Sequence, residues 1–189
     1  MRLTGRGVDD AEVTALLDRW AERVRSLVPE VVFGYDADTM ESVVLDLLRE
    51  RGLTIGVAES VTGGLVSGRL TATAGASDVM RGGVVAYASE VKFDVLGVAQ
   101  GPVINEETAR TMAMGVRRTV GSSVGLALTG VAGPSEQDGA KVGTLCIAVA
   151  LPDGVASSTT VMLPGDRKTM RELAVISALN YLRQLLLRA

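Results

Sequence analysis

Residues 58–64 (AESVTGG) follow a short apolar run and contain a serine, a threonine and two glycines. A strand is expected to end and a helix to begin in this stretch. Ser60 could be the N-cap of that helix, because serine is favoured there and Gly63 and Gly64 permit close packing. Ser60 could instead be a nucleophile whose developing oxyanion faces helix N–H groups. A phosphate cradle is disfavoured, because the stretch lacks the Gly-Lys-Ser/Thr ending of phosphate-binding loops. Local sequence alone favours the cap.

The chain contains no histidine, which excludes Ser-His-Asp and Cys-His catalysis as well as His-ligated zinc. A serine nucleophile would therefore need another base, and a lysine with a lowered pKa can serve. Lys92 is the leading candidate, because it lies one turn into the helix expected after an apolar strand. Tyr87 could share the proton path or hold the serine hydroxyl. The alternative is that Lys92 is an ordinary surface lysine, with a pKa near ~10.4, and Tyr87 a strand aromatic.

Polar residues follow the ends of three expected strands, and in open α/β sheets ligands gather beyond such ends. The first cluster is residues 59–64, the second joins residues 87–89 to Lys92, and the third is residues 129–134. Turn chemistry alone could explain the glycines of the third cluster, but its N–H groups could also bind a carbonyl or phosphate oxygen. The residues that we expect to contact substrate are Glu59, Thr62, Gly63, Gly64, Thr129, Gly130 and Gly133. Arg167 and Lys168 lie near the start of the last helix, where such side chains are usually solvated, but one of them could meet a phosphate.

The elements that position these residues follow from hydrophobic periodicity and caps. Helices are predicted at 9–27, 38–52, 60–75, 89–97, 105–122 and after Pro164. Strands are predicted at 31–35, 53–59, 82–89 and 123–130, and two more within 142–163, joined at a Pro-Asp-Gly turn. This alternation predicts an α/β domain with a mixed, mostly parallel sheet. We expect that domain to cover residues 39–189, preceded by a helix–strand appendage at residues 1–38.

The composition limits the classes of partner. Of 189 residues, 47% are hydrophobic and 22% charged, which suits a packed core, and the net charge of −3 without a basic stripe argues against nucleic acid and acidic membranes. No apolar stretch approaches the ~20 residues of a membrane span, and the first residues lack an apolar secretory core, so a cytoplasmic location is expected. Cys146, the only cysteine, lies mid-strand and is expected to be buried and inert. Apolar residues on the first and last helices favour a homo-oligomer.

Four stretches stand out in order along the chain: TIGVAESVTGGLVSGRLT, VVAYASEVKFDVLGV, ALTGVAGPSEQDGAKVGTLCIAVA and LPGDRKTMRELAVISAL. Together they resemble the CinA C-terminal domain family, which includes the nicotinamide-nucleotide amidases. The resemblance covers about residues 39–188. It implies a three-layer α/β/α fold, no metal or cofactor, and hydrolysis of the carboxamide of nicotinamide mononucleotide, which is a small nucleotide substrate, to nicotinate mononucleotide and ammonia.

By the same resemblance, the nucleophile falls on Ser60, the base on Lys92 and the assisting tyrosine on Tyr87. Arg167 matches the arginine of the PGDR motif, which we assign to the phosphate. Val61 stands where the family commonly has cysteine. Two alternatives from other classes remain open. One is a catalytically silent module that binds nucleotide or docks a partner, and the other is a phosphate-binding regulator that uses magnesium.

Overall fold

The computed structural model describes residues 1–188, and the chain divides into two compact units, at 1–38 and from 39 onward. In the first unit, the predicted helix is confirmed as α1 (Asp10–Leu27). The Asp9 carboxylate caps α1 by accepting a hydrogen bond of 2.9 Å from the N–H of Glu12.

The strand predicted at residues 31–35 is wrong. The chain turns there, and the N–H groups of Val31 and Val32 both donate to the carbonyl of Val28. No strand within residues 1–188 pairs with this stretch, so its β-branched and aromatic residues have no ladder to join.

The second unit is built on a sheet with the strand order β2-β1-β3-β4-β5. The central strand β1 pairs in parallel with both β2 and β3, whereas β4 is antiparallel to both of its neighbours. Two of the four pairings in this described sheet are parallel and two are antiparallel, which confirms a mixed sheet but not that most of its pairings are parallel. The bounds are β1 (Ile55–Glu59), β2 (Met80–Val85), β3 (Val124–Gly130), β4 (Thr144–Ala150) and β5 (Ala156–Met162).

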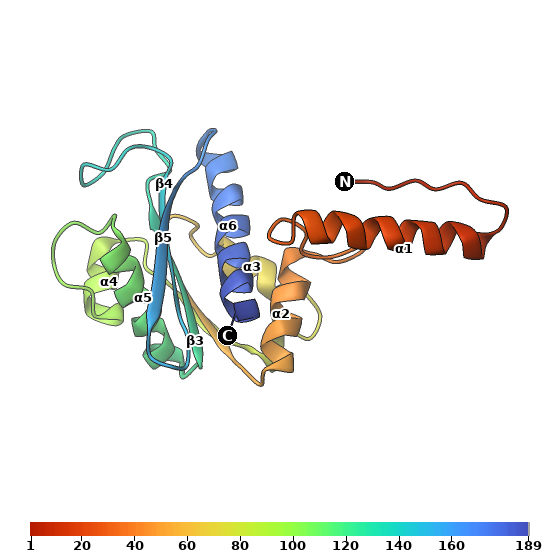
Figure 1. Cartoon of the computed structure of the whole chain (residues 1–189). Coiled ribbons are helices and arrows are strands. Elements are labelled where there is room, and N and C mark those ends of the chain that lie inside the picture. Colours follow the sequence, from red (N-terminus) through yellow and green to blue (C-terminus); the bar gives the residue numbers. More distant parts are fainter. Residues whose placement is uncertain (189) are drawn as a thin grey trace. The chain divides into compact units, whose positions relative to one another are not determined.

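Helices cover both faces of the sheet, as the predicted three-layer α/β/α arrangement requires (Figure 1). One face carries α2, α3 and α6, and the other carries α4 and α5. A short 3₁₀ turn, η1 (Ala76–Asp78), precedes β2. The helices are α2 (Met40–Glu50), α3 (Leu65–Thr71), α4 (Ser89–Leu96), α5 (Glu106–Val120) and α6 (Arg167–Arg188).

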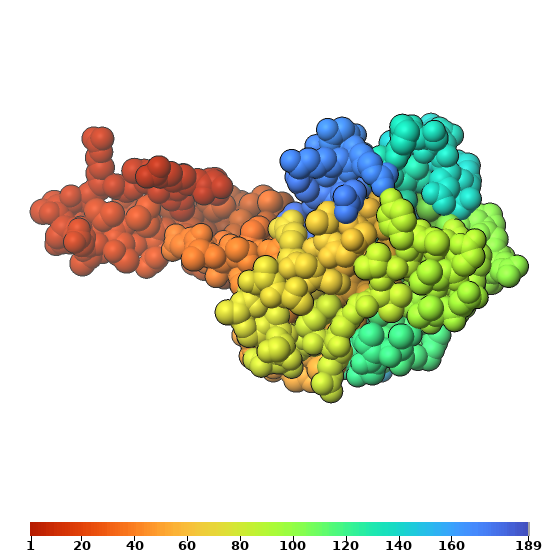
Figure 2. Space-filling view, turned by 180° about the vertical axis from the view of Figure 1, so that it is seen from behind, coloured from red at the N-terminus to blue at the C-terminus, as the bar shows by residue number. Residues whose placement is uncertain are grey.

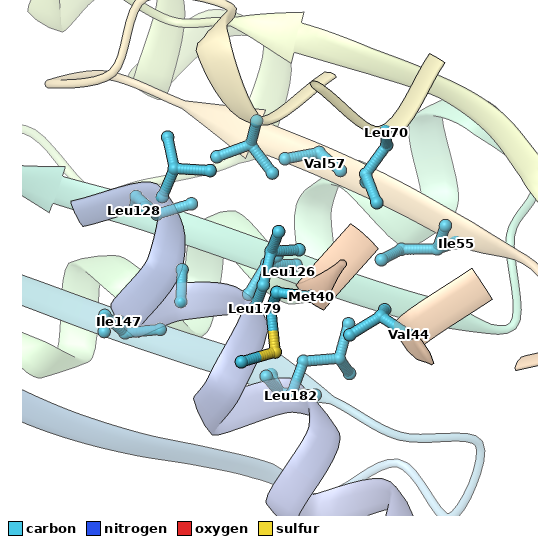
Figure 3. Close-up of a cluster of buried hydrophobic side chains, with 14 of the residues drawn as sticks. Met40, Val44, Ile55, Val57, Leu70, Leu126, Leu128, Ile147, Leu179 and Leu182 are labelled. Atoms are coloured by element: carbon cyan, nitrogen blue, oxygen red, sulfur yellow. The ribbon is translucent and has the colours of Figure 1, made fainter. Parts of the chain in front are cut away.

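The two faces of the sheet are packed with side chains of different size. Val57 and Leu126 point to the face where large aliphatic side chains of α2 and α6 fill the core (Figure 3). Ala58 and Ala127, the next residue of each strand, point to the other face, where α4 and α5 lie. The side-chain alternation of β1 and β3 therefore decides which helical layer each residue beyond the strand ends can reach.

Candidate active site

Ser60 extends the ladder of β1 by one residue instead of starting a helix. Its N–H donates to the carbonyl of Leu128 at 3.0 Å, and the residue is only 8% exposed. Because strand side chains alternate, Ser60 follows Ala58 onto the α4/α5 face. The predicted helix start at residue 60 is wrong: Gly63 and Gly64 have φ of +60° and +97°, and α3 begins only after them. The N-cap interpretation of Ser60 is thereby excluded.

Glu59 takes over the capping of α3. Its carboxylate is fully buried and accepts the N–H groups of Gly64, Val66 and Ser67 at 2.8–3.0 Å and the Ser67 hydroxyl at 2.7 Å. Each oxygen thus accepts two hydrogen bonds, and the negative charge lies against the start of the helix. The geometry supports a role for Glu59 in holding the turn rather than in contacting substrate.

This capping changes which N–H groups could stabilise an oxyanion. The N–H groups at the start of α3 already donate to Glu59, and the N–H of Gly63 donates to the Ser60 carbonyl. Within residues 1–188, the N–H groups of Val61 and Thr62 donate to no protein group. The oxyanion site expected at the helix start is therefore better placed at these two N–H groups.

Glu59→Gln should destabilise the domain by about 2–4 kcal/mol, because the carboxamide offers one acceptor oxygen and turns an N–H donor toward buried donors. Urea unfolding at neutral pH measures the change. Glu172→Gln, on an exposed part of α6, is the matched control and should change the stability by less than about 0.5 kcal/mol. An equally small effect at Glu59 would show that its hydrogen bonds do not hold the turn.

Lys92 is buried in α4, with 2% of its surface exposed. It lies one turn before Leu96, which packs with Ala58 on the α4/α5 face, so Lys92 lies on the face of the sheet that Ser60 reaches. Burial lowers the pKa of the Lys92 ammonium below its ordinary value of 10.5, and the carboxylates of Asp138 and Glu90 partly oppose this change. The alternative that Lys92 is an ordinary surface lysine is wrong.

Tyr87 is largely exposed and lies beside the turn that follows Ser60. Its hydroxyl accepts a hydrogen bond of 2.6 Å from Arg167, which also donates to the Gly133 carbonyl at 2.9 Å. A Cβ atom on Gly63 would lie 4.0 Å from the Tyr87 ring. The structure thus brings together predicted site residues from three strand ends and the start of α6, where the corresponding segments adjoin on the surface (Figure 2).

Thr129 and Gly130 have structural roles at the end of β3. The Thr129 hydroxyl is buried and donates to the Val103 carbonyl at 2.9 Å, and a side chain on Gly130 would clash with the backbone of Thr144. Thr62 is fully buried, and its hydroxyl has no hydrogen-bond partner within residues 1–188.

Two residues near the site, Asp138 and Arg171, were not identified from the sequence. Asp138 accepts the N–H of Val103 at 2.7 Å, so both polar groups of Val103 are held by side chains. Its Asp-Gly sequence signals a turn, but not where that turn lies. Arg171 donates to the Thr62 carbonyl at 2.6 Å. Its position four residues after Arg167, on the same side of a helix, is the signal that could have identified it.

A cavity of about 640 Å³ lies between α3 and the start of β2, with Thr71, Ala74 and Arg81 in its lining. The catalytic candidates Ser60, Lys92 and Tyr87 are not among the residues that line it. The site is therefore defined by its polar groups at the strand ends rather than by this cavity.

The fold and the site define an α/β/α domain with a serine and a buried lysine on one face at the carboxyl end of its parallel strands. Residues 37–186 match the CinA C-terminal domain. The chain belongs to that family.

Known relatives agree with this membership. The chain is 46% identical to a CinA-like protein of Frankia casuarinae over 191 aligned residues, which cover 98% of this chain and 44% of that protein. A competence/damage inducible protein from Agrobacterium tumefaciens shares 31% identity and a TM-score of 0.73, covering 82% of this chain and 98% of that one. A CinA superfamily protein from Enterobacter cloacae shares 28% identity and a TM-score of 0.73, covering 82% and 97%.

The chain spans less than half of the length of the curated relatives that it matches, from 44% to 47% for the most similar ones. None of the helices in residues 1–188 has the length and apolar character needed to cross a membrane.

Proposed function

We propose that this chain is an amidohydrolase that converts nicotinamide mononucleotide to nicotinate mononucleotide and ammonia through an acyl-enzyme on Ser60. The observation that carries the proposal is the buried Lys92, with its lowered pKa, on the face of the sheet that Ser60 reaches. A lysine gains a base's properties when burial favours its neutral form, and a serine without histidine needs such a base.

In the first half of the reaction, neutral Lys92 takes the proton of the Ser60 hydroxyl while the serine oxygen attacks the carboxamide carbon. The N–H groups of Val61 and Thr62 stabilise the oxyanion. The carbon–nitrogen bond then breaks as the Lys92 ammonium returns the proton to the nitrogen, and ammonia leaves. Lys92, neutral again, takes a proton from the water that attacks the ester. As the ester bond breaks, the Lys92 ammonium returns this proton to the Ser60 oxygen, and the acid product ionises to the carboxylate.

In this scheme the roles of Tyr87 and Arg167 are linked, because the Arg167 guanidinium donates to the Tyr87 hydroxyl. Direct proton transfer between Ser60 and Lys92 requires no displacement of Arg167, whereas a route through the Tyr87 hydroxyl does, because Arg167 binds that hydroxyl. Arg167 is assigned to the substrate phosphate, since a guanidinium binds phosphate oxygens in a bidentate manner.

Ammonia release from nicotinamide mononucleotide by the purified chain tests the proposal. We expect activity that EDTA does not reduce and a kcat/KM that rises with pH, because the neutral lysine is the active form. The midpoint should lie below 10.5, since burial lowers the pKa of Lys92. Absence of ammonia release would refute the amidase. Binding of the nucleotide without release would instead indicate the catalytically silent module.

A further inference from the structure

Two arginines one turn apart on α6 reach across to the strand ends. Arg167 donates to the Tyr87 hydroxyl after β2 and to the Gly133 carbonyl after β3. Arg171 donates to the Thr62 carbonyl in the turn after β1. Residues four apart on a helix share a face, so both guanidinium groups are directed to the same edge of the sheet, beside the turn that follows Ser60.

The positive charge of this pair has no carboxylate partner. All acceptors described for the two guanidinium groups are neutral oxygens, and neither arginine forms an ion pair within residues 1–188. The nearby carboxylate of Asp166 is directed to the start of α6, where it accepts the N–H of Thr169 at 2.8 Å. An anion that reaches this edge would therefore meet two positive charges and the positive end of a long helix.

The backbone beside the two arginines carries no side chain at Gly63. A Cβ atom on Gly63 would lie 3.4 Å from Nη2 of Arg171, and Gly63 has a positive φ that other residues rarely adopt. On the same turn, the Thr62 hydroxyl is buried and unpartnered in the described part of the chain. A side chain at position 63 would crowd the Arg171 guanidinium, which glycine leaves open.

We infer that Arg167 and Arg171 together bind the phosphate monoester of the substrate, and that Arg171 makes the enzyme select a nucleotide over the corresponding nucleoside. This inference rests on the proposed function and extends it to a residue that the sequence did not single out. Phosphate oxygens replace neutral oxygens as acceptors of the two guanidinium groups. Arg167 thereby releases the Tyr87 hydroxyl when a phosphorylated substrate binds.

The test compares kcat/KM for nicotinamide mononucleotide and nicotinamide riboside in the wild type and in Arg171→Gln. Glutamine keeps an N–H donor for the Thr62 carbonyl and removes the charge. We expect kcat/KM for the nucleotide to fall about 10- to 100-fold, mainly through KM, and kcat/KM for the riboside to fall much less. Lys168→Ala, which removes an exposed charge from the same helical turn, should leave the preference unchanged. An Arg171→Gln enzyme that keeps the wild-type preference overturns the inference.

A second measurement does not depend on turnover. Inorganic phosphate should raise the melting temperature of the wild type and of Lys168→Ala more than that of Arg167→Gln or Arg171→Gln, each compared with its own phosphate-free value. If no variant releases ammonia but phosphate stabilises only the proteins with both arginines, the amidase is refuted and the anion site stands. Equal stabilisation of all four proteins overturns the anion site, whether or not the wild type is active.

Discussion

Ser60→Ala is expected to lower kcat/KM for nicotinamide mononucleotide by at least about a thousandfold, because it removes the atom that forms the acyl-enzyme. The fold should not change. The Ser60 hydroxyl donates to no protein group in the described chain, and the contact that continues the β1 ladder is made by the backbone N–H. Ammonia release under saturating and limiting substrate, together with the melting temperature, measures both effects.

Ser135→Ala, in an exposed loop, is the matched control and should retain full activity. Trapping the acyl-enzyme adds a second readout: mass spectrometry of the acid-quenched wild type should show the nicotinoyl nucleotide ester on the peptide that contains Ser60. A Ser60→Ala enzyme with more than about a tenth of the wild-type kcat/KM would exclude Ser60 as the nucleophile.

Lys92→Met is expected to act in opposite directions on activity and stability. The kcat/KM should fall by about 10²–10⁴, the contribution typical of a positioned general base. The free energy of unfolding at pH 7 should rise, because methionine fills a similar volume and the cost of burying an ammonium disappears. In a domain of this size, each ~1 kcal/mol gained raises the melting temperature by about 2–4 °C.

The pH dependence of the free energy of unfolding is a second test of the buried Lys92, because the direction of its slope can be predicted. Burial lowers the pKa of Lys92 in the folded chain, so between that lowered pKa and 10.5 the unfolded chain binds more protons than the folded one. Wild-type stability should therefore rise with pH across this window, and the part due to Lys92 should be absent from Lys92→Met. Lys141→Met, at an exposed position, should leave the slope unchanged. A Lys92→Met protein that is less stable than the wild type at pH 7 would contradict a destabilising buried lysine.

The elements that could be predicted from sequence are those whose signals are local. Thr39 and Asn105 cap α2 and α5, and Gly97 ends α4, each within one residue of the bounds predicted for these helices. The prediction of a strand at residues 31–35 was wrong because a strand must pair with a segment that lies elsewhere in the sequence. Residue types show only that a stretch is compatible with a strand, not that a pairing partner is present. The start of α3 failed because its cap is Glu59, a residue of the preceding strand whose side chain reaches forward past the turn.

The same distinction between local signals and distant contacts applies to the residues of the candidate site. Ser60 and Lys92 could be proposed because each follows a strand end, and the missing histidine limits the possible bases. Asp138 could not, since it lies on a loop whose position is fixed by Val103, far away in the sequence. Arg171 could be placed on the same side of the helix as Arg167, but its contact with the Thr62 carbonyl could not be predicted. Sequence periodicity places residues on a face of one element, but it does not state which segments meet at an edge of the sheet.

The alternation along β1 continues beyond the strand and places two separate structural demands on position 61. The side chain of Val61 lies in the aliphatic core of the α2/α6 face, while its N–H group is the one proposed to meet the oxyanion. Any compact apolar side chain satisfies the first demand, and every residue except proline supplies the second. Replacing Val61 by cysteine should therefore keep both the core packing and the N–H group, although the residue immediately before it is the proposed nucleophile.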